Sequence, residues 1–195
     1  MKTTGIVTPQ GRETRLCDLF REKGVADLQT WELVWVNVVF NFPTAMWYVT
    51  ELGLGQWSAT HMRQLLHARC PHLSPRTITN AVLELVGLFQ HTPIGGVLNQ
   101  GAVDIAARPR MVTREGLQDP SLSALTHSFI TLFHRQETDA LSVDEPLPWP
   151  WIVFGCAKSR VIERTVMEYP RLLAIDAKNS VIRLNLQEAS HVGIC

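Results

Sequence analysis

The sequence predicts a mainly α-helical protein that also contains small β-hairpins, which is an α+β fold class. Two observations predict the helices: apolar residues recur at helical spacing between residues 30 and 89, and serine caps precede two of the apolar stretches. A third observation predicts a hairpin, because apolar and polar residues alternate over 181–186 after a turn-forming segment. At 195 residues, the chain can bury a substantial core as one domain or as two small ones.

The composition limits the function classes to be considered. The chain is 46% hydrophobic and 18% charged, and its formal net charge is zero, whereas nucleic-acid binders often carry a basic surplus. The longest apolar run, 34–42, is interrupted by Asn37 and Asn41 and is too short to span a bilayer. The four cysteines form no CxxC pair, and the N-terminus has no signal pattern. We therefore expect a cytoplasmic protein without disulfides, metal site, cofactor or membrane contact.

Motifs that carry catalysis are missing from the sequence, which contains no GxSxG, no HExxH and no paired-carboxylate motif. Residues 155–159 resemble part of a phosphate-binding loop, but Pro150 stands where that loop requires its first glycine. His127 and His134 fall on one helix face, yet no third metal ligand accompanies them, so we expect structural or surface histidines. These observations predict a protein that is not an enzyme.

The beginning of the chain divides into two parts. Residues 1–29 are polar, contain several glycines and are expected to form a partly irregular N-terminal extension. A first module is predicted over residues 30–116, where Thr30 caps an apolar helix and a second apolar helix follows over 45–52. Three of the six tryptophans lie between residues 31 and 47 among aliphatic neighbours, so we expect them to fill the core rather than to stack on bases.

Residues 58–89 are predicted to be two helices joined by a turn. Ser58 caps the first helix, the chain breaks at 70–73, and Ser74-Pro75 starts the second. The exposed first turn of the second helix carries polar and charged side chains: Arg76, Thr77 and Asn80. This pattern is typical of a helix-turn-helix, whose second helix presents its first residues to base edges or phosphates. An ordinary helical hairpin inside an all-α domain is the alternative.

Short strands are predicted after this helix pair, at 97–98, 103–105 and 110–113. A helix-turn-helix followed by a β-hairpin is the arrangement of a winged helix, in which basic residues of the hairpin contact DNA phosphates. The candidates for this contact are Arg108, Arg110 and Arg114.

Acidic residues are absent from two basic stretches of this module. None occurs between Gln56 and Leu83, where Arg63 and Arg69 precede Arg76. None occurs from Ala106 to Arg114. Both stretches fit a surface that attracts phosphates, and chance clustering on a solvated face explains them as well.

A second module is predicted over residues 117–186, followed by a tail over 187–195. Its first helix is expected to start at Asp119-Pro120, and an irregular connection is expected over 137–150. A helix over 157–169 and a hairpin complete the module. The order of elements repeats that of the first module, so the chain is expected to hold two winged-helix-like modules. The candidate DNA-binding residues of the second module are Lys158, Arg160 and Arg164.

Several short sequence segments resemble those of a known family. They are Asn41-Phe42-Pro43, residues 73–77 with Asn80-Ala81, residues 92–95, Asp119-Pro120 and residues 152–155. In this order they resemble an uncharacterised bacterial family that is encoded near sulfur-transfer and DNA-phosphorothioation genes in phage-defence islands. The resemblance covers about residues 30–186. It implies a DNA-associated role in defence or regulation and supplies no catalytic residues.

Two functional hypotheses follow from the sequence. The first is a winged-helix protein that binds double-stranded DNA, including modified DNA, as a regulatory or accessory component of a bacterial defence system. The second is a non-catalytic scaffold subunit, whose neutral charge and apolar composition suit a surface covered by a partner. A homodimer or other proteins of a defence complex are the protein partners that these hypotheses predict.

Overall fold

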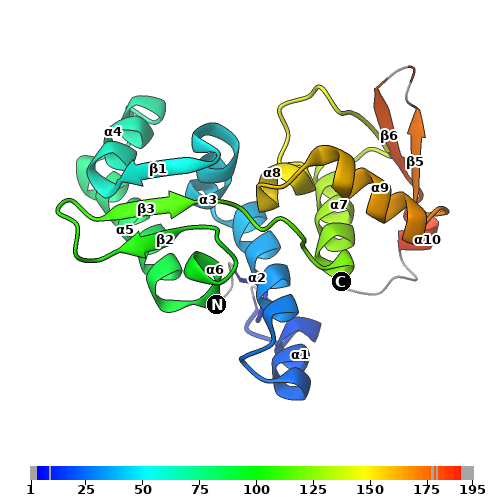
Figure 1. Ribbon diagram of the computed structural model, residues 1–195, viewed down its shortest axis with the longest axis horizontal. Coiled ribbons are helices and arrows are strands. Elements are labelled where there is room, and N and C mark those ends of the chain that lie inside the picture. Colours follow the sequence, from blue (N-terminus) through cyan, green and yellow to red (C-terminus); the bar gives the residue numbers. More distant parts are fainter. Residues whose placement is uncertain (1–3, 9, 177, 179, 190–195) are drawn as a thin grey trace.

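The computed structural model describes residues 4–8, 10–176, 178 and 180–189, and they form an α+β fold (Figure 1). Two three-stranded antiparallel sheets lie toward opposite ends of the long axis, and helices α2 (Leu28–Asn41) and α7 (Leu122–Gln136) stand between them. Parts of the predicted N-terminal extension, of the turn at 176–179 and of the tail lie outside the described residues. The mainly helical α+β prediction is confirmed.

The first helices are amphipathic or fully buried. Helix α1 (Arg15–Lys23) lies within the predicted irregular extension, and α2 follows. The N-cap of α2 is Asp27 rather than the predicted Thr30, because the Asp27 carboxylate accepts a hydrogen bond from the Thr30 backbone N–H at 3.0 Å. Helix α3 (Pro43–Trp47) continues directly into a π-helical turn, η1 (Tyr48–Leu52).

The helix pair predicted at 58–89 is confirmed. Strand β1 (Gly55–Ser58) leads into α4 (Ala59–Arg69), and α5 (Pro75–His91) follows a turn. Ser58 Oγ accepts from the His61 N–H at 3.0 Å, and Ser74 Oγ accepts from the Thr77 N–H at 3.1 Å. The serine side chains therefore satisfy backbone donors that the first turn of each helix leaves open.

We call residues 30–116 the first half of the chain and residues 117–186 the second half. The hairpin of the first half differs in detail from its prediction. Helix α6 (Pro93–Gly96) ends beside the predicted strand 97–98, whose two backbone N–H groups instead bond to the Pro93 carbonyl. The strands of the hairpin are β2 (Ala102–Asp104) and β3 (Met111–Arg114). Strand β3 is central, and the strand order is β1-β3-β2.

The second half uses a similar order of elements, but no helix corresponding to α6 stands between its last long helix and its hairpin in the described residues. After α7 come β4 (Ala140–Ser142), α8 (Pro150–Phe154), α9 (Lys158–Glu168), β5 (Leu173–Asp176), β6 (Val181–Leu184) and α10 (Leu186–Ala189). The strand order is β4-β6-β5, again with the last strand in the centre. Helix α7 is capped by Ser121 and not by Asp119, since Ser121 Oγ accepts from the Ala124 N–H at 3.3 Å. Strand β4 lies where an irregular connection was expected.

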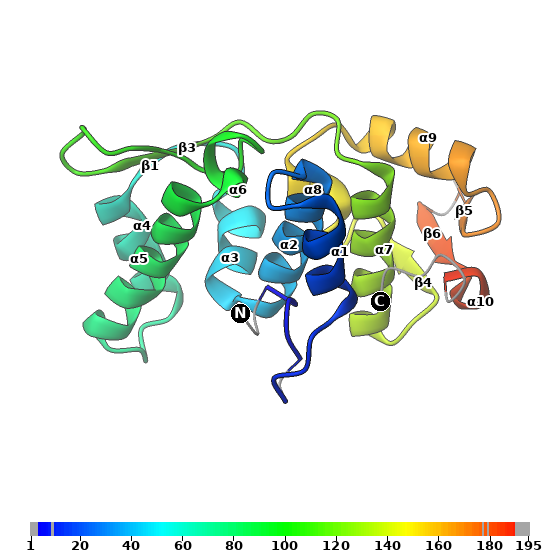
Figure 2. The same cartoon turned by 90° about the horizontal axis from the view of Figure 1, so that it is seen from below.

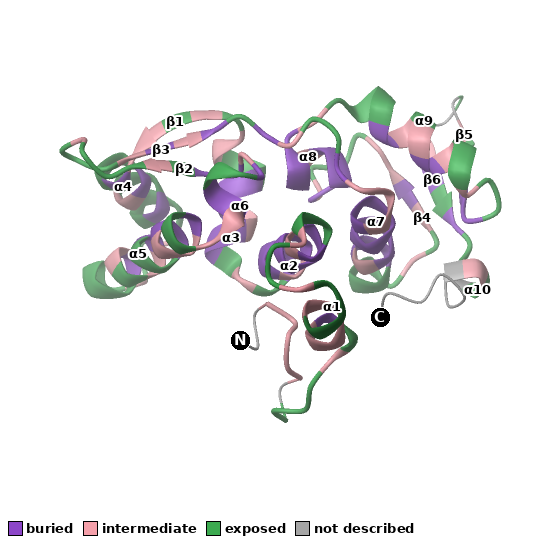
Figure 3. Ribbon diagram, turned by 60° about the horizontal axis from the view of Figure 1, so that its bottom comes forward, coloured by how far each residue is buried: buried purple, intermediate pink, exposed green. Residues whose placement is uncertain are grey.

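One hydrophobic core continues through both halves (Figure 3). Helix α2 packs against α7, and the Glu32 carboxylate of α2 accepts from the Ser121 N–H at the start of α7 at 2.7 Å. The indole Nε1 of Trp35 donates to the Val153 carbonyl at 2.8 Å. Of the three tryptophans predicted to fill the core, Trp35 and Trp47 are buried, and Trp31 is partly buried against the core; Trp149 and Trp151 are buried as well.

Candidate nucleic-acid interface

The first turn of α5 presents two free polar side chains to solvent. Arg76 and Asn80 are exposed, and neither side chain has a hydrogen bond or an ion pair within the part of the chain that the structure describes. Thr77 is also exposed, but its hydroxyl lies 2.9 Å from Ser74 Oγ and belongs to the cap. The inner face of the same helix is anchored by Ile78 and Val82, which are buried. A firmly packed helix therefore holds the Arg76 guanidinium and the Asn80 amide in water.

The two arginines of α4 are less available than the sequence suggested. Arg63 is half-buried and folds back on its own helix, where Nε donates to the Ala59 carbonyl at 3.1 Å. Arg69 is exposed, and its Nε donates to Glu51 Oε1 at 2.9 Å. This hydrogen bond and the charge of Glu51 raise the pKa of Arg69. The carboxylate also cancels part of the positive potential that Arg69 would present to a phosphate.

The β2–β3 turn projects from the end of the sheet beside α4 and carries two further cations (Figure 2). Asp104 shapes the turn, because its Oδ1 accepts from the backbone N–H groups of Ala106 and Ala107 at 2.9 and 3.2 Å. Arg108 is exposed and donates to the Ile105 carbonyl at 2.6 Å through one Nη. Arg110 is exposed, and its carbonyl accepts from the Ala59 N–H at 2.9 Å. That bond ties the turn to the start of α4.

Arg114 does not belong to this surface, and its predicted phosphate contact is wrong. Its side chain is buried, and its guanidinium donates to the carbonyls of Ile152 at 2.7 Å and Val153 at 3.0 Å. It also donates to Gln100 Oε1 at 3.2 Å. Burial lowers the pKa of Arg114 to about 10. Arg114 therefore links β3 of the first half to α8 of the second half.

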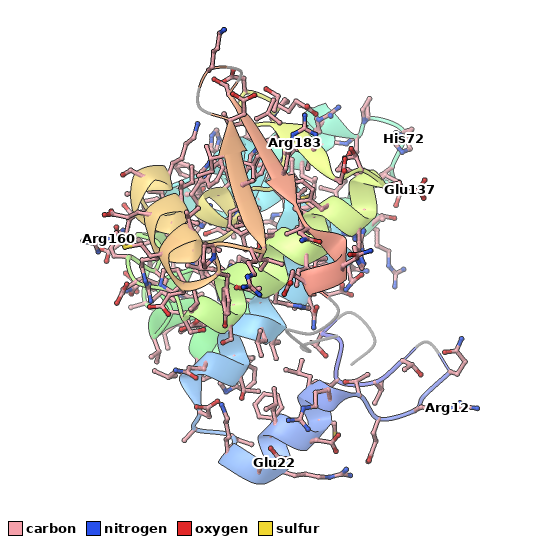
Figure 4. The ribbon with its side chains drawn as sticks, turned by 90° about the vertical axis from the view of Figure 1, so that its right-hand side faces the viewer. Arg12, Glu22, His72, Glu137, Arg160 and Arg183 are labelled. Atoms are coloured by element: carbon pink, nitrogen blue, oxygen red, sulfur yellow. The ribbon has the colours of Figure 1, made fainter. Side chains whose placement is uncertain are left out.

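The cations of α9 are mostly engaged with their own half. Lys158 Nζ lies 5.5 Å from the ring centroid of Trp151. Arg164 donates to Asp119 Oδ1 at 2.6 Å and to the Pro120 carbonyl at 2.8 Å. Arg160 is exposed at the edge of α9 (Figure 4). Of the three residues predicted here, Arg160 alone makes no hydrogen bond, ion pair or ring contact with the residues that the structure describes.

The two helical histidines have structural surroundings. His127 is buried, and its Nε2 lies 2.9 Å from Asn37 Oδ1, so this nitrogen carries the proton. Burial lowers the pKa of His127 to about 4. His134 lies seven residues, or two helical turns, further along α7 and is exposed. Within the described residues, no three His, Cys, Asp or Glu side chains are grouped so that they could hold a metal ion.

Comparisons with known proteins give no match: no family model, no curated protein and no solved structure resembles the chain. In the described part of the chain, no helix has both the length and the apolar composition needed to cross a membrane. The exposed cations of the first half therefore lie in two places, the first turn of α5 and the β2–β3 turn, and the second of these is bonded to the start of α4.

Proposed function

We propose that the protein binds double-stranded DNA as a winged-helix protein, with α5 as its recognition helix. The observation that carries the proposal is the start of α5, where Arg76 and Asn80 stand free in water on a helix fixed by its buried face. An arginine pairs with guanine O6 and N7 in the major groove, and an asparagine pairs with adenine N6 and N7. Their position in the first turns of the second helix is the position from which helix-turn-helix proteins contact bases.

The order of elements around α5 supports the same proposal. From η1 onward the elements are a helix, a strand, two helices, the short helix α6 and a two-stranded hairpin, and the second strand of the hairpin lies between the other two strands of the sheet. In a winged helix, the turn of this hairpin is the wing, and its basic residues contact the sugar-phosphate backbone. Arg108 and Arg110 occupy that turn, and the only acidic side chain at its base, Asp104, already binds two backbone N–H groups.

The biological setting that we propose comes from the family resemblance of the sequence. Phosphorothioation-linked phage-defence islands suggest a regulatory or accessory component that acts on DNA in a bacterial defence system. In this proposal the first half provides the DNA-binding surface. The second half has a similar order of elements, but among its predicted cations Arg160 is the one that remains free for DNA.

The test is a gel-shift titration of the full chain on mixed-sequence duplex DNA over a series of salt concentrations. Wild-type affinity is expected to fall steeply with salt, because phosphate contacts release counterions. Replacing Arg76 with alanine is expected to weaken binding about tenfold, equivalent to about 1.4 kcal/mol. Double replacement of Arg108 and Arg110 is expected to weaken binding and to reduce the salt dependence.

The matched control is Arg12→Ala, which removes an exposed arginine of the N-terminal extension and so changes net charge equally. We expect its affinity to stay within about twofold of wild type. Equal losses for Arg12→Ala and Arg76→Ala would reduce the effect to net charge. Absence of duplex binding even at low salt would rule out the proposed function.

A protein-interaction scaffold is the second candidate function. The observation that favours it is Leu83, which is 50% exposed on the outer side of α5, one turn beyond Asn80. A second copy or a partner helix could cover this side chain, and Leu83→Glu would then abolish the association. Light scattering of the wild-type chain and of Leu83→Glu, both without DNA, distinguishes a scaffold from a monomeric DNA binder.

A further inference from the structure

A cavity of about 450 Å³ lies behind the helix-turn-helix. Its walls come from α3 and η1 on one side and from the end of α4, the turn and the start of α5 on the other. The apolar side chains that line it are Met46, Trp47, Leu66, Leu73, Ile78 and Ala81. Its volume falls within the usual range for small-molecule sites, which are mostly apolar with a few polar groups that orient the ligand.

Thr44 supplies a polar group in this cavity. The residue is 6% exposed and lines the cavity, and its hydroxyl makes no hydrogen bond to any residue that the structure describes. Because that hydroxyl is reached by solvent from the cavity, it is available to donate to or accept from a polar atom of a bound ligand. Thr50, which also lines the cavity, differs because its hydroxyl already donates to the Met46 carbonyl at 2.8 Å.

Arg69 supplies a charged group at the rim of the same cavity. Its Nε is taken by Glu51 at 2.9 Å, but its terminal Nη groups have no hydrogen-bond partner within the described residues. A guanidinium has five N–H donors, so four remain for an incoming acceptor. A carboxylate matches this fork geometry with two parallel hydrogen bonds.

We propose that the cavity binds a small monocarboxylic acid with an apolar body. The carboxylate lies against the Nη groups of Arg69, and the aromatic or aliphatic body fills the space between Trp47 and Leu73. The Glu51 carboxylate, which also lines the cavity, already balances the charge of Arg69, so the ligand carboxylate is held by hydrogen bonds from the Nη groups, and a dianion is repelled more strongly than a monoanion. A purely apolar ligand would leave the Arg69 donors and the Thr44 hydroxyl unused.

The position of the cavity gives its occupant a route to the recognition helix. Leu73, Ile78 and Ala81 form one wall, and they belong to the turn and to the inner side of α5. Arg76 and Asn80 lie on the outer side of the same helical turns. The site is therefore placed for an effector, although binding of the acid does not depend on whether the protein binds DNA.

The test is an NMR titration of the full ¹⁵N-labelled chain with indole-3-acetate, phenylacetate and octanoate at up to millimolar concentration. At least one acid is expected to shift the amide signals of Leu73, Ile78 and Ala81 in a saturable manner. The neutral analogue indole-3-acetamide is expected to bind at least about tenfold more weakly, since it lacks the charge that Arg69 recognises.

Variants separate this site from non-specific binding. Arg69→Gln is expected to reduce affinity for the acid about tenfold, whereas Arg63→Gln on the same helix, outside the cavity, is expected to change it less than about twofold. Ala81→Phe fills the cavity and is expected to abolish the shifts, and its own amide spectrum shows whether the fold is retained. No saturable shift with any acid, equal affinity for acid and amide, or unchanged binding in Arg69→Gln would overturn the proposal. These readouts use no DNA, so their failure is distinct from failure of the proposed function.

Discussion

The two halves of the protein share an order of elements but use their surface helices differently. In the first half, α4 has 11 residues and α5 has 17, and the first turns of α5 leave Arg76 and Asn80 free. In the second half, the corresponding α8 has 5 residues and α9 has 11, and Arg164 of α9 is bound by Asp119. Equal topology has therefore produced one helix with an open polar start and one whose cations mostly serve the fold.

The reason for the difference lies in how the halves join. Helix α8 faces the first half, and its carbonyl groups bind Arg114 and Trp35 from that half. Helix α9 follows this helix of 5 residues, whereas α5 follows the 11-residue α4, and the starts of both α5 and α9 are exposed. A shared order of elements therefore does not leave the same side chains in water in both halves.

Removal of the Arg114 side chain, which links the two halves, is expected to have the largest effect on stability. Arg114→Ala removes the side-chain donor of the Ile152 carbonyl and of the Gln100 amide oxygen in a largely buried site, whereas the Val153 carbonyl keeps its bond from Trp35 Nε1. We expect the free energy of unfolding to fall by about 3–5 kcal/mol. Urea denaturation followed by tryptophan fluorescence measures it, and a transition that splits in two would show that the halves have become independent.

The control for this prediction is Arg110→Ala, which removes an exposed arginine of the same hairpin. Its cost is expected to be within about 0.5 kcal/mol, because its side chain has no buried partner. A similarly small effect for Arg114→Ala would mean that the other contacts between the halves, such as α2–α7 packing and the Trp35–Val153 hydrogen bond, join them without Arg114.

The elements that the sequence predicted well are those specified by neighbouring residues. The two helices of the helix pair start within a few positions of their signals, which are Ser58, Ser74 and Pro75. The hairpin of β5 and β6 is visible in the sequence because apolar and polar residues alternate along its second strand. The short strands β1 and β4 were missed because three or four residues have no pattern of their own. They are strands only because they pair with β3 and β6, far along the chain.

The candidate site was predictable to the same extent and for the same reason. Exposure of Arg76 and Asn80 follows from the helical period, which places Ile78 and Val82 inside. Whether Arg69, Arg114 and Arg164 are free depends on partners 14 or more positions away, such as Glu51, Gln100 and Asp119. No local pattern distinguishes a free arginine from a paired one, and burial of Arg114 is visible only once α8 is in place.

The free energy of unfolding is expected to depend on pH through His127, which lies where α7 packs against α2. The pKa of His127 is about 4 in the folded protein, below its ordinary value of 6.5, because burial disfavours the charged ring. The unfolded chain therefore takes up a proton that the folded chain refuses, and stability is lost as the pH falls from about 6.5 toward 4. The full loss is expected to be about 3 kcal/mol.

The measurement compares urea denaturation of wild type and of His127→Gln between pH 7 and pH 4.5. Glutamine keeps a donor for Asn37 but does not titrate, so its curve should lack this loss. Glu32 at the same seam acts in the opposite direction, because burial raises its pKa and its contribution declines as the pH rises. The difference between the two proteins isolates His127, and parallel curves would contradict the prediction.

The smallest expected effect comes from exchanging the caps of the two surface helices. Helix α5 begins at Ser74, whose side chain accepts from the Thr77 N–H, while α9 begins at Ala157 with no side-chain cap. Both N-cap residues have extended backbone angles, so serine at 157 can adopt the geometry that it has at 74. Ser74→Ala is expected to cost about 1 kcal/mol, and Ala157→Ser is expected to gain up to about that amount. Thermal unfolding of both single variants and of the double variant measures the two changes in stability.

Additive effects would show that each helix start is stabilised by its own neighbouring residues, so that the open start of α5 can be altered without disturbing α9. A gain at 157 that vanishes in the Ser74→Ala background would instead show that the two helix starts are coupled through the shared core.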